Sequence, residues 1–192
     1  EIHLNRIPLS GLTDLKWLLV TGEAFPADLC NEWFKLYPQI PVVNAYGPTE
    51  CSDDVTHFII NSPLLEDFST VPIGRPVRNT QIYILDKNYQ PLPVGASGEL
   101  FVGGEGVGRG YLNNEKQTKK AFISNPFNPG KLFYRTGDMA RFLANGDIEF
   151  LGRIDHQIKI RGFRIEIGEI ESTLRKHKYI KDAVVVMRTI NN

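Results

Sequence analysis

The stretch NAYGPTE, from Asn44 to Glu50, places an amide, an aromatic ring, a hydroxyl and a carboxylate around a Gly-Pro turn. A turn needs only the glycine and the proline, so the other side chains are candidates for binding a ligand. The Glu50 carboxylate suits Mg²⁺ bound to a nucleotide, because such a cation uses few protein carboxylates. Thr49 and the N–H groups of the turn suit a phosphate, and the Tyr46 ring suits a base. These residues alone leave open the alternative of an ordinary polar turn.

Two later stretches contain further candidates. In YRTGD, from Tyr134 to Asp138, the carboxylate near a turn suits the two hydroxyls of a ribose, although a hairpin aspartate can also satisfy its own backbone. The glycine-rich stretch GGEGVGRG, from Gly103 to Gly110, has the composition of a phosphate loop. No helix is expected to start behind it, so we interpret its glycines as those of a bulged β-hairpin.

The first candidates must be positioned by strands that end beside them. KWLLVTG (16–22) and IPVVNAY (40–46) have the apolar character of buried strands, and residues 27–37 have the pattern of an amphipathic helix opened by Pro26. The order strand, helix, strand predicts an α/β fold with a parallel sheet covered on both faces. In such sheets ligands bind beyond the carboxyl ends of the strands, where TGEAF and NAYGPTE both lie.

The pattern changes beyond about residue 72 to short strands separated by turns, including a hairpin built on ANGD (144–147). This part predicts a small antiparallel or barrel-like β subdomain. After Asp155 the sequence predicts a hairpin, a helix over 167–176 and a strand, which is how an α+β lobe begins. We therefore divide the chain into an α/β core (1–75), a β-rich subdomain (76–154) and the start of a C-terminal lobe (155–192).

The composition of the 192 residues excludes several classes of protein. The chain is 42% hydrophobic, and Lys+Arg and Asp+Glu both total 22, so we expect a globular protein without a nucleic-acid or membrane-surface partner. No apolar stretch approaches the roughly 20 residues of a transmembrane helix, and the first residues lack a signal-peptide pattern, so we expect a cytoplasmic protein. Cys30, Cys51 and the four histidines show neither a disulfide framework nor metal-ligand spacing.

Four stretches together resemble one family. NAYGPTE, GELFVGGEGVGRGYL, YRTGD and GRIDHQIKIRGFRIEIGEIE occur in the order and approximate spacing of the adenylation domains of nonribosomal peptide synthetases. These domains belong to the adenylate-forming superfamily, which includes acyl-CoA synthetases and luciferases. The resemblance covers nearly the whole chain, and it implies the later part of the large lobe of such a domain followed by the start of its small lobe.

The resemblance implies a role for each candidate. Asn44 would meet the adenine edge, Tyr46 would stack on the ring, Thr49 would touch phosphate and Glu50 would hold Mg²⁺. The implied nucleotide-binding residues are Gly22, Asn44, Ala45, Tyr46, Gly47, Thr49, Asp138, Phe150 and Arg153, with Thr49 and Glu50 also catalytic. Asp138 would bind the ribose hydroxyls. Family members often have Tyr where this chain has Phe150, and Asp155 matches the hinge of the small lobe.

The implied reaction has two steps and needs ATP, Mg²⁺ and a carrier protein. A substrate carboxylate attacks the α-phosphorus of ATP to give an acyl-adenylate, and the phosphopantetheine thiol of a carrier domain then takes the acyl group. The family's phosphate loop would lie upstream of residue 1 and its catalytic Lys beyond residue 192. We therefore expect the 192-residue chain to be a fragment that is inactive without the rest of the adenylation domain.

The resemblance also implies a substrate pocket lined by Leu19, Thr21, Ala45, Asp53 and Asp54. Because consecutive strand residues point to opposite faces, we expect only one aspartate, Asp54, to face the substrate, and a solvated aspartate pair is the alternative. A buried carboxylate needs a partner, which predicts a substrate with a polar side chain. Amino, hydroxy and keto acids stay open. An acyl-CoA ligase, and a non-catalytic or interrupted segment acting as scaffold, remain alternatives for the whole.

Overall fold

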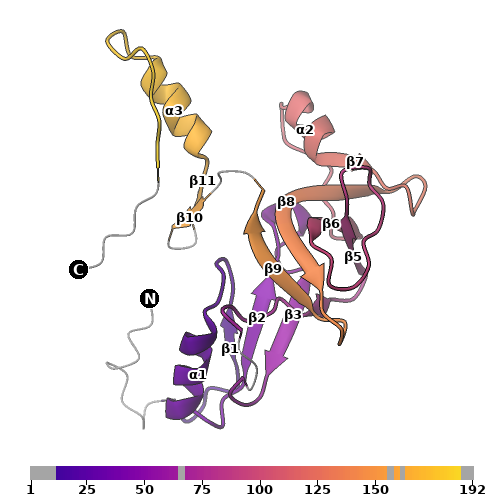
Figure 1. Cartoon of the computed structure of the whole chain (residues 1–192), viewed down its shortest axis with the longest axis vertical. Helices are drawn as coiled ribbons and strands as arrows, with labels where there is room; N and C mark the ends of the chain where they lie inside the picture. The colour runs from indigo at the N-terminus through magenta and orange to yellow at the C-terminus, as the bar shows by residue number, and fades with distance from the viewer. Residues whose placement is uncertain (1–11, 65–67, 155–157, 161–162, 187–192) are drawn as a thin grey trace. The chain divides into compact units, whose positions relative to one another are not determined.

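The structure is a computed structural model that describes residues 12–64, 68–154, 158–160 and 163–186 (Figure 1). Its internal contacts divide the chain into two compact units, Glu1–Ile154 and Asp155–Asn192. Within the described ranges, no helix is long and apolar enough to cross a membrane.

The first unit begins with a mixed four-stranded sheet in the order β1-β2-β3-β4. Its elements are β1 (Leu18–Val20), helix α1 (Ala27–Leu36), β2 (Val42–Tyr46), a short 3-10 helix η3 (Thr49–Cys51), β3 (Thr56–Ile60) and β4 (Arg75–Pro76). The predicted parallel pair is confirmed, since β1 and β2 are parallel with Leu18 opposite Val42. Strands β3 and β4 are antiparallel to their neighbours. The connection from β2 to β3 is too short for a parallel crossover, which explains the mixed sheet.

Helix α1 covers one face of this sheet. It begins directly after Pro26, which has φ −63°, and its apolar positions Cys30, Trp33 and Phe34 follow helical spacing and are buried. These side chains pack with Val42 of β2, and burying a large apolar side chain contributes about 2 to 3 kcal/mol. The predicted amphipathic helix is therefore confirmed.

A second, antiparallel sheet follows in the same unit, as the sequence predicts. Strand order is β5-β6-β8-β7, and β9 pairs with the other part of β8. Its elements are β5 (Thr80–Leu85), β6 (Gly98–Gly104), helix α2 (Glu115–Ala121), β7 (Phe122–Ser124), β8 (Leu132–Phe142) and β9 (Ile148–Arg153). The ANGD hairpin is confirmed between β8 and β9, where Gly146 adopts φ 88°.

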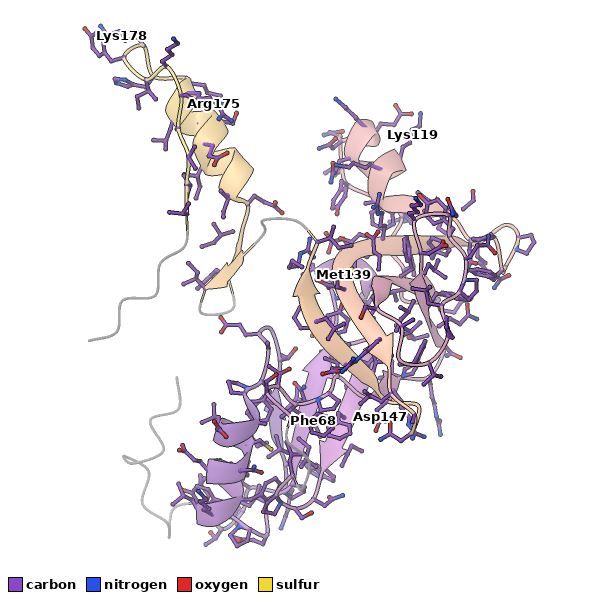
Figure 2. All side chains as sticks on the ribbon, viewed as in Figure 1. Phe68, Lys119, Met139, Asp147, Arg175 and Lys178 are labelled. Atoms are coloured by element: carbon purple, nitrogen blue, oxygen red, sulfur yellow. The ribbon has the colours of Figure 1, made fainter. Side chains whose placement is uncertain are left out.

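One hydrophobic core runs across the expected boundary at residue 75. Cys51 and Val55, which both precede β3, share a buried cluster with Leu100 and Val102 of β6. The backbone of Ile148 also exchanges hydrogen bonds with residues 73 and 74. The Asp147 carboxylate, labelled in Figure 2, accepts a hydrogen bond from Arg75 Nε at 2.9 Å. The two sheets therefore form a single folded unit.

The second unit contains the expected hairpin and helix. Strands β10 (Ile158–Ile160) and β11 (Phe163–Ile165) are antiparallel, and helix α3 (Ile167–Arg175) follows them. The predicted final strand is not formed over the described residues 182–186. There the Val185 N–H donates to Glu171 Oε1 at 3.0 Å, and not to a neighbouring strand. Asp155, the expected hinge residue, lies outside the described residues.

Candidate functional site

The NAYGPTE stretch leaves β2 through a turn that folds back closely on itself. A Cβ atom on Gly47 would lie 1.6 Å from the Asp53 carbonyl oxygen, so no other residue type fits at this position. Ser52 and Asp53 both have left-handed φ values, 64° and 77°, which cost roughly 1 to 2 kcal/mol per non-glycine residue. Strain of this kind often accompanies functional turns.

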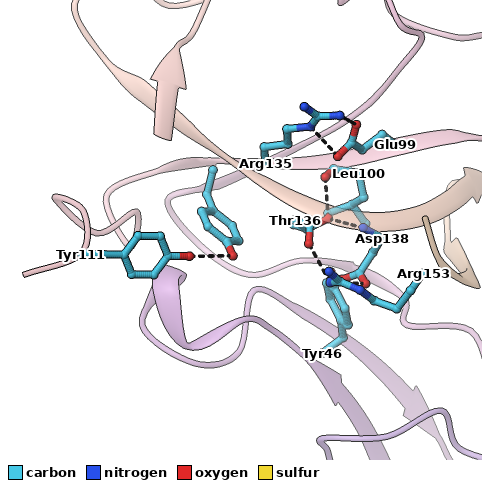
Figure 3. A network of polar contacts seen from close by, with 9 residues as sticks. Tyr46, Glu99, Leu100, Tyr111, Arg135, Thr136, Asp138 and Arg153 are labelled. Carbon is cyan, nitrogen blue, oxygen red and sulfur yellow. Dashed lines mark hydrogen bonds and ion pairs between the residues drawn. The ribbon is translucent and has the colours of Figure 1, made fainter. Parts of the chain in front are cut away.

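The turn meets the second sheet through Tyr46. Its hydroxyl donates a short hydrogen bond to Asp138 Oδ2, although the two residues are 92 positions apart (Figure 3). Arg153 Nη1 donates to Asp138 Oδ1 at 3.0 Å and to the Thr136 carbonyl at 2.7 Å. Thr136 Oγ1 accepts the Asp138 N–H at 3.0 Å and donates to the Leu100 carbonyl at 2.7 Å. We refer to Tyr46, Thr136, Asp138 and Arg153 as the ribose cluster, after the role expected for Asp138.

A local irregularity in β8 positions Asp138. Gly137 has φ 74° inside the strand, and the pairing register with β6 shifts across it, because Glu99 lies opposite Met139 while Phe101 lies opposite Arg135. Bulges of this kind redirect a side chain and recur beside active sites. The redirected carboxylate is 6% exposed and is compensated by Arg153, which lies opposite it on β9. Burial, followed by the Asp138 charge, raises the pKa of Tyr46 well above its usual value, so this phenol stays a hydrogen-bond donor.

Phe150 adds a second aromatic ring beside Tyr46 of the ribose cluster. The centroids of Tyr46 and Phe150 are 6.2 Å apart with the ring planes inclined by 37°. Phe150 comes from β9, where it lies opposite Ala140. The structure thus brings together Tyr46, Asp138, Phe150 and Arg153, all of which the sequence predicts as nucleotide-binding residues.

Glu50 lies beside two tyrosines for which the sequence predicts no role of their own. The Tyr111 hydroxyl donates to Glu50 Oε1 at 2.6 Å and lies 3.4 Å from the Tyr134 hydroxyl. Burial, followed by hydrogen bonding to Tyr111 and the Glu50 charge, raises the pKa of Tyr134. The described residues contain no group of three or more metal-ligating side chains. A single carboxylate fits a Mg²⁺ ion that arrives with nucleotide phosphates, because Mg²⁺ then keeps several waters and needs one or two carboxylates.

The glycine-rich stretch from Gly103 to Gly110 differs from both interpretations considered above. Gly103 and Gly104 end β6, and the residues after them form a loop that packs on the Glu50 turn, where a Cβ atom on Gly106 or Gly108 would lie within 3 Å of that turn's carbonyl oxygens. The expectation that no helix follows is wrong, because α2 begins at Glu115. Its Asn114 cap, whose side chain accepts the Gln117 N–H at 3.1 Å, is the sequence feature that indicates this helix.

Asn44 and Thr49 take no part in the side-chain hydrogen bonds described above for Tyr46, Asp138 and Glu50. The Asn44 side chain is buried, and its Nδ2 donates to the carbonyls of Val71 and Pro72 at 3.2 and 2.9 Å. It therefore ties β2 to the segment before β4. Thr49 is exposed as the first residue of η3, and Gly22 follows β1 with φ 92°.

The expected substrate pocket lies on the sheet face opposite α1. Leu19, Thr21 and Ala45 share this face through the parallel register of β1 and β2, and Leu19 is 54% exposed. Asp54 joins them, because Thr21 Oγ1 donates to Asp54 Oδ1 at 3.4 Å. His57 Nε2 lies 3.4 Å from Asp54 Oδ2.

Asp53 and Asp54 differ in exposure, and strand alternation is not the reason. Both precede β3, and the left-handed backbone of Asp53 leaves it exposed while Asp54 is half-buried. A donor on the substrate is the partner expected for Asp54, and within the protein Thr21 and His57 also lie within reach of its carboxylate. His57 lies opposite Ala45 in the register of β2 and β3, and its i+3 spacing from Asp54 is the sequence feature that was missed.

Comparison with known proteins shows the family of the chain. The family described as "AMP-binding enzyme" matches residues 5–112, more than half of the chain. The chain belongs to this family. Tyrocidine synthase 1 of Brevibacillus parabrevis is 47% identical over 186 residues, which is 97% of this chain and 17% of that protein. Bacitracin synthase 1 of Bacillus licheniformis is 47% identical over 190 residues, which is 96% of this chain and 4% of that protein.

Solved members of the AMP-binding enzyme family have the same fold. NpsA-ThdA, an artificially fused adenylation-PCP di-domain from Klebsiella oxytoca, superposes with a TM-score of 0.79 at 32% identity, covering 96% of this chain and 34% of that one. The Vibrio cholerae adenylation domain AlmE, in complex with glycyl-adenosine-5'-phosphate, gives 0.77 at 35% identity over 88% of this chain and 32% of that one. The chain thus spans about a third of each solved relative.

Proposed function

We propose that the intact protein contains an adenylation domain of nonribosomal peptide synthesis, which activates a carboxylic acid with ATP. The observation that carries the proposal is the hydrogen bond between Tyr46 and Asp138, which joins the end of β2 to the bulge of β8. It places an aromatic ring, a buried carboxylate and a guanidinium together, next to a turn that carries Glu50. Such a set suits a base, a ribose and a metal-bound phosphate. The peptide-synthetase relatives support the same function.

In the first half-reaction, a carboxylate oxygen of the substrate attacks the α-phosphorus of ATP, and pyrophosphate leaves. Asp138 accepts the ribose hydroxyls, Tyr46 and Phe150 pack on the nucleoside, and Asn44 meets the adenine edge. Arg153 would sit beside the phosphate and Glu50 would hold Mg²⁺, so that the two side chains would position the triphosphate. The cation supplies Lewis-acid stabilisation of charge on the phosphate oxygens. Thr49, exposed at the start of η3, is the phosphate contact.

In the second half-reaction, the phosphopantetheine thiol of a carrier domain loses its proton and attacks the acyl carbon, and AMP leaves. The fused adenylation-PCP di-domain among the solved relatives supports a carrier domain as partner. Asp155 is the proposed hinge between the two steps, because it begins the second compact unit.

A two-stage assay of the intact protein tests this function. ATP–pyrophosphate exchange is measured with a panel of amino, hydroxy and keto acids, and the activated acid is then offered to its carrier domain and to free coenzyme A. We expect exchange with one acid class and acylation of the carrier thiol, detected by intact mass. Acylation of coenzyme A alone would instead identify an acyl-CoA ligase, and a folded protein without any exchange would leave a scaffold role.

The pocket face gives a prediction about substrate choice. Asp54 stands among Leu19, Thr21 and Ala45, with His57 beside it. We expect a substrate with a polar side chain, because a donor on the substrate can replace the long 3.4 Å contact from Thr21. Asp54→Ala should shift the exchange ranking toward apolar acids by about 10-fold or more, since a polar substrate then loses its acceptor. Asp14→Ala, at an exposed aspartate before β1, is the control, and an unchanged ranking in Asp54→Ala would place Asp54 outside the pocket.

A further inference from the structure

The Tyr111 hydroxyl is a part of the site that nucleotide binding does not itself require. It donates to Glu50 Oε1 at 2.6 Å, and Figure 3 shows it pointing toward a second phenol, which is 3.4 Å away on Tyr134. Hydrogen bonds from a hydroxyl to a carboxylate are shorter and about twice as strong as those between neutral groups. The contact therefore restricts how the Glu50 carboxylate can be oriented.

Tyr111 is itself held by its backbone, its ring and the glycine before it. Its N–H donates to Thr118 Oγ1 of α2 at 2.8 Å, and its ring contacts Phe122 edge-on with centroids 5.5 Å apart. Gly110 has φ 130°, and a Cβ atom there would lie 2.3 Å from Thr118 Cγ2. Only glycine allows this close approach, so the hydroxyl is fixed in place before any ligand binds.

The same loop separately fixes the main chain of the Glu50 turn. The Gly108 N–H donates to the Glu50 carbonyl at 2.8 Å, and Ser52 Oγ donates to the Gly106 carbonyl at 2.9 Å. The backbone of the turn therefore has contacts that do not depend on the Tyr111 hydroxyl. Removing that hydroxyl should change the orientation of the carboxylate while the turn itself is retained.

We propose that Tyr111 is a positioning residue that orients the Glu50 carboxylate toward the Mg²⁺ of bound ATP. The inference rests on the proposed function, because it assigns to Tyr111 a role in the same metal site. Groups that hydrogen-bond a metal-binding carboxylate typically change metal affinity by 10- to 100-fold when they are removed. Tyr111 acts through Glu50 and does not itself contact the nucleotide.

The test is Tyr111→Phe in the intact protein, followed by calorimetric titration of Mg²⁺ in the presence of a non-hydrolysable ATP analogue. We expect Mg²⁺ binding to weaken by about 10-fold, with analogue binding in the absence of Mg²⁺ and the melting temperature both little changed. Tyr83→Phe is the matched control. It removes a phenol hydroxyl on β5 that contacts Gln81 at 3.2 Å, away from Glu50.

A double-mutant cycle separates positioning from a structural role. In a Glu50→Gln background, Tyr111→Phe should weaken Mg²⁺ binding by less than about 2-fold, because the carboxylate it orients is already gone. Independent, multiplicative losses in the two variants would overturn the inference, as would unchanged Mg²⁺ affinity in Tyr111→Phe. A wild-type protein that does not bind the analogue at all would overturn the proposed function itself, which distinguishes the two failures.

Discussion

Replacing Glu50 by Gln should lower ATP–pyrophosphate exchange by about 100-fold or more while leaving the fold intact. Glutamine has almost the same shape and can still accept the Tyr111 hydroxyl, but it brings no negative charge to Mg²⁺. The backbone of the turn keeps its bond from Gly108, so little stability should be lost. The loss of rate should be seen at saturating ATP, since it arises from charge stabilisation during transfer.

The matched control for this change is Glu99→Gln. Glu99 is also a partly buried glutamate, and it is paired with Arg135 at 2.8 Å on β6 and β8, outside the proposed metal site. We expect normal exchange in this variant. If Glu50→Gln instead lost thermal stability in proportion to its activity, Glu50 would be a structural carboxylate of the turn.

Replacing Asp138 by Asn should raise the KM for ATP by about 10- to 100-fold, because hydrogen bonds to a charged group contribute about 1.5 to 3 kcal/mol. The KM for the acid should change far less. Tyr46→Phe should have a smaller effect of the same kind, since it removes one donor to Asp138 and keeps the ring that packs on the nucleoside. Steady-state kinetics with each substrate varied in turn separates these effects.

Asp147→Asn is the control for Asp138. Both aspartates are buried and paired with an arginine in the same unit, but Asp147 lies at the β8–β9 turn with Arg75. Its replacement should lower the melting temperature without changing the KM for ATP. Equal rises of that KM in both variants would show that loss of a buried ion pair, and not loss of a ribose contact, is responsible.

The sequence predicts the local elements well because each has a strong pattern. Pro26 before an amphipathic run and the apolar strands on either side are local features, and α1, β1 and β2 follow from them. The direction of β3 and the helix α2 were not predicted. The direction of β3 depends on the short connection from β2. Helix α2 has only seven residues and no apolar face, so hydrophobic periodicity does not detect it.

The candidate site shows the same division between local and distant information. The motifs predict Tyr46, Asp138 and Arg153 as site residues. The hydrogen bonds that join them depend on the bulge at Gly137, which the spacing of the motifs does not predict. Tyr111 lies within one of the motifs, but the motif predicts no role for it, because its contact with Glu50 spans 61 positions of the chain. The partners of Asp54 were missed for a related reason, since Thr21 belongs to another strand.

The tight turn after β2 has a consequence for altering substrate choice by design. Glu50 and Asp54 lie on the same strained segment, which Gly47 allows to fold back within contact of the Asp53 backbone. A substitution at position 53 or 54 that relaxes the left-handed residues would move the carboxylate proposed to bind Mg²⁺ along with the proposed pocket wall. Exchanging the specificity of this protein should therefore succeed more often when residues 47–54 are transplanted as one block than when single pocket residues are changed.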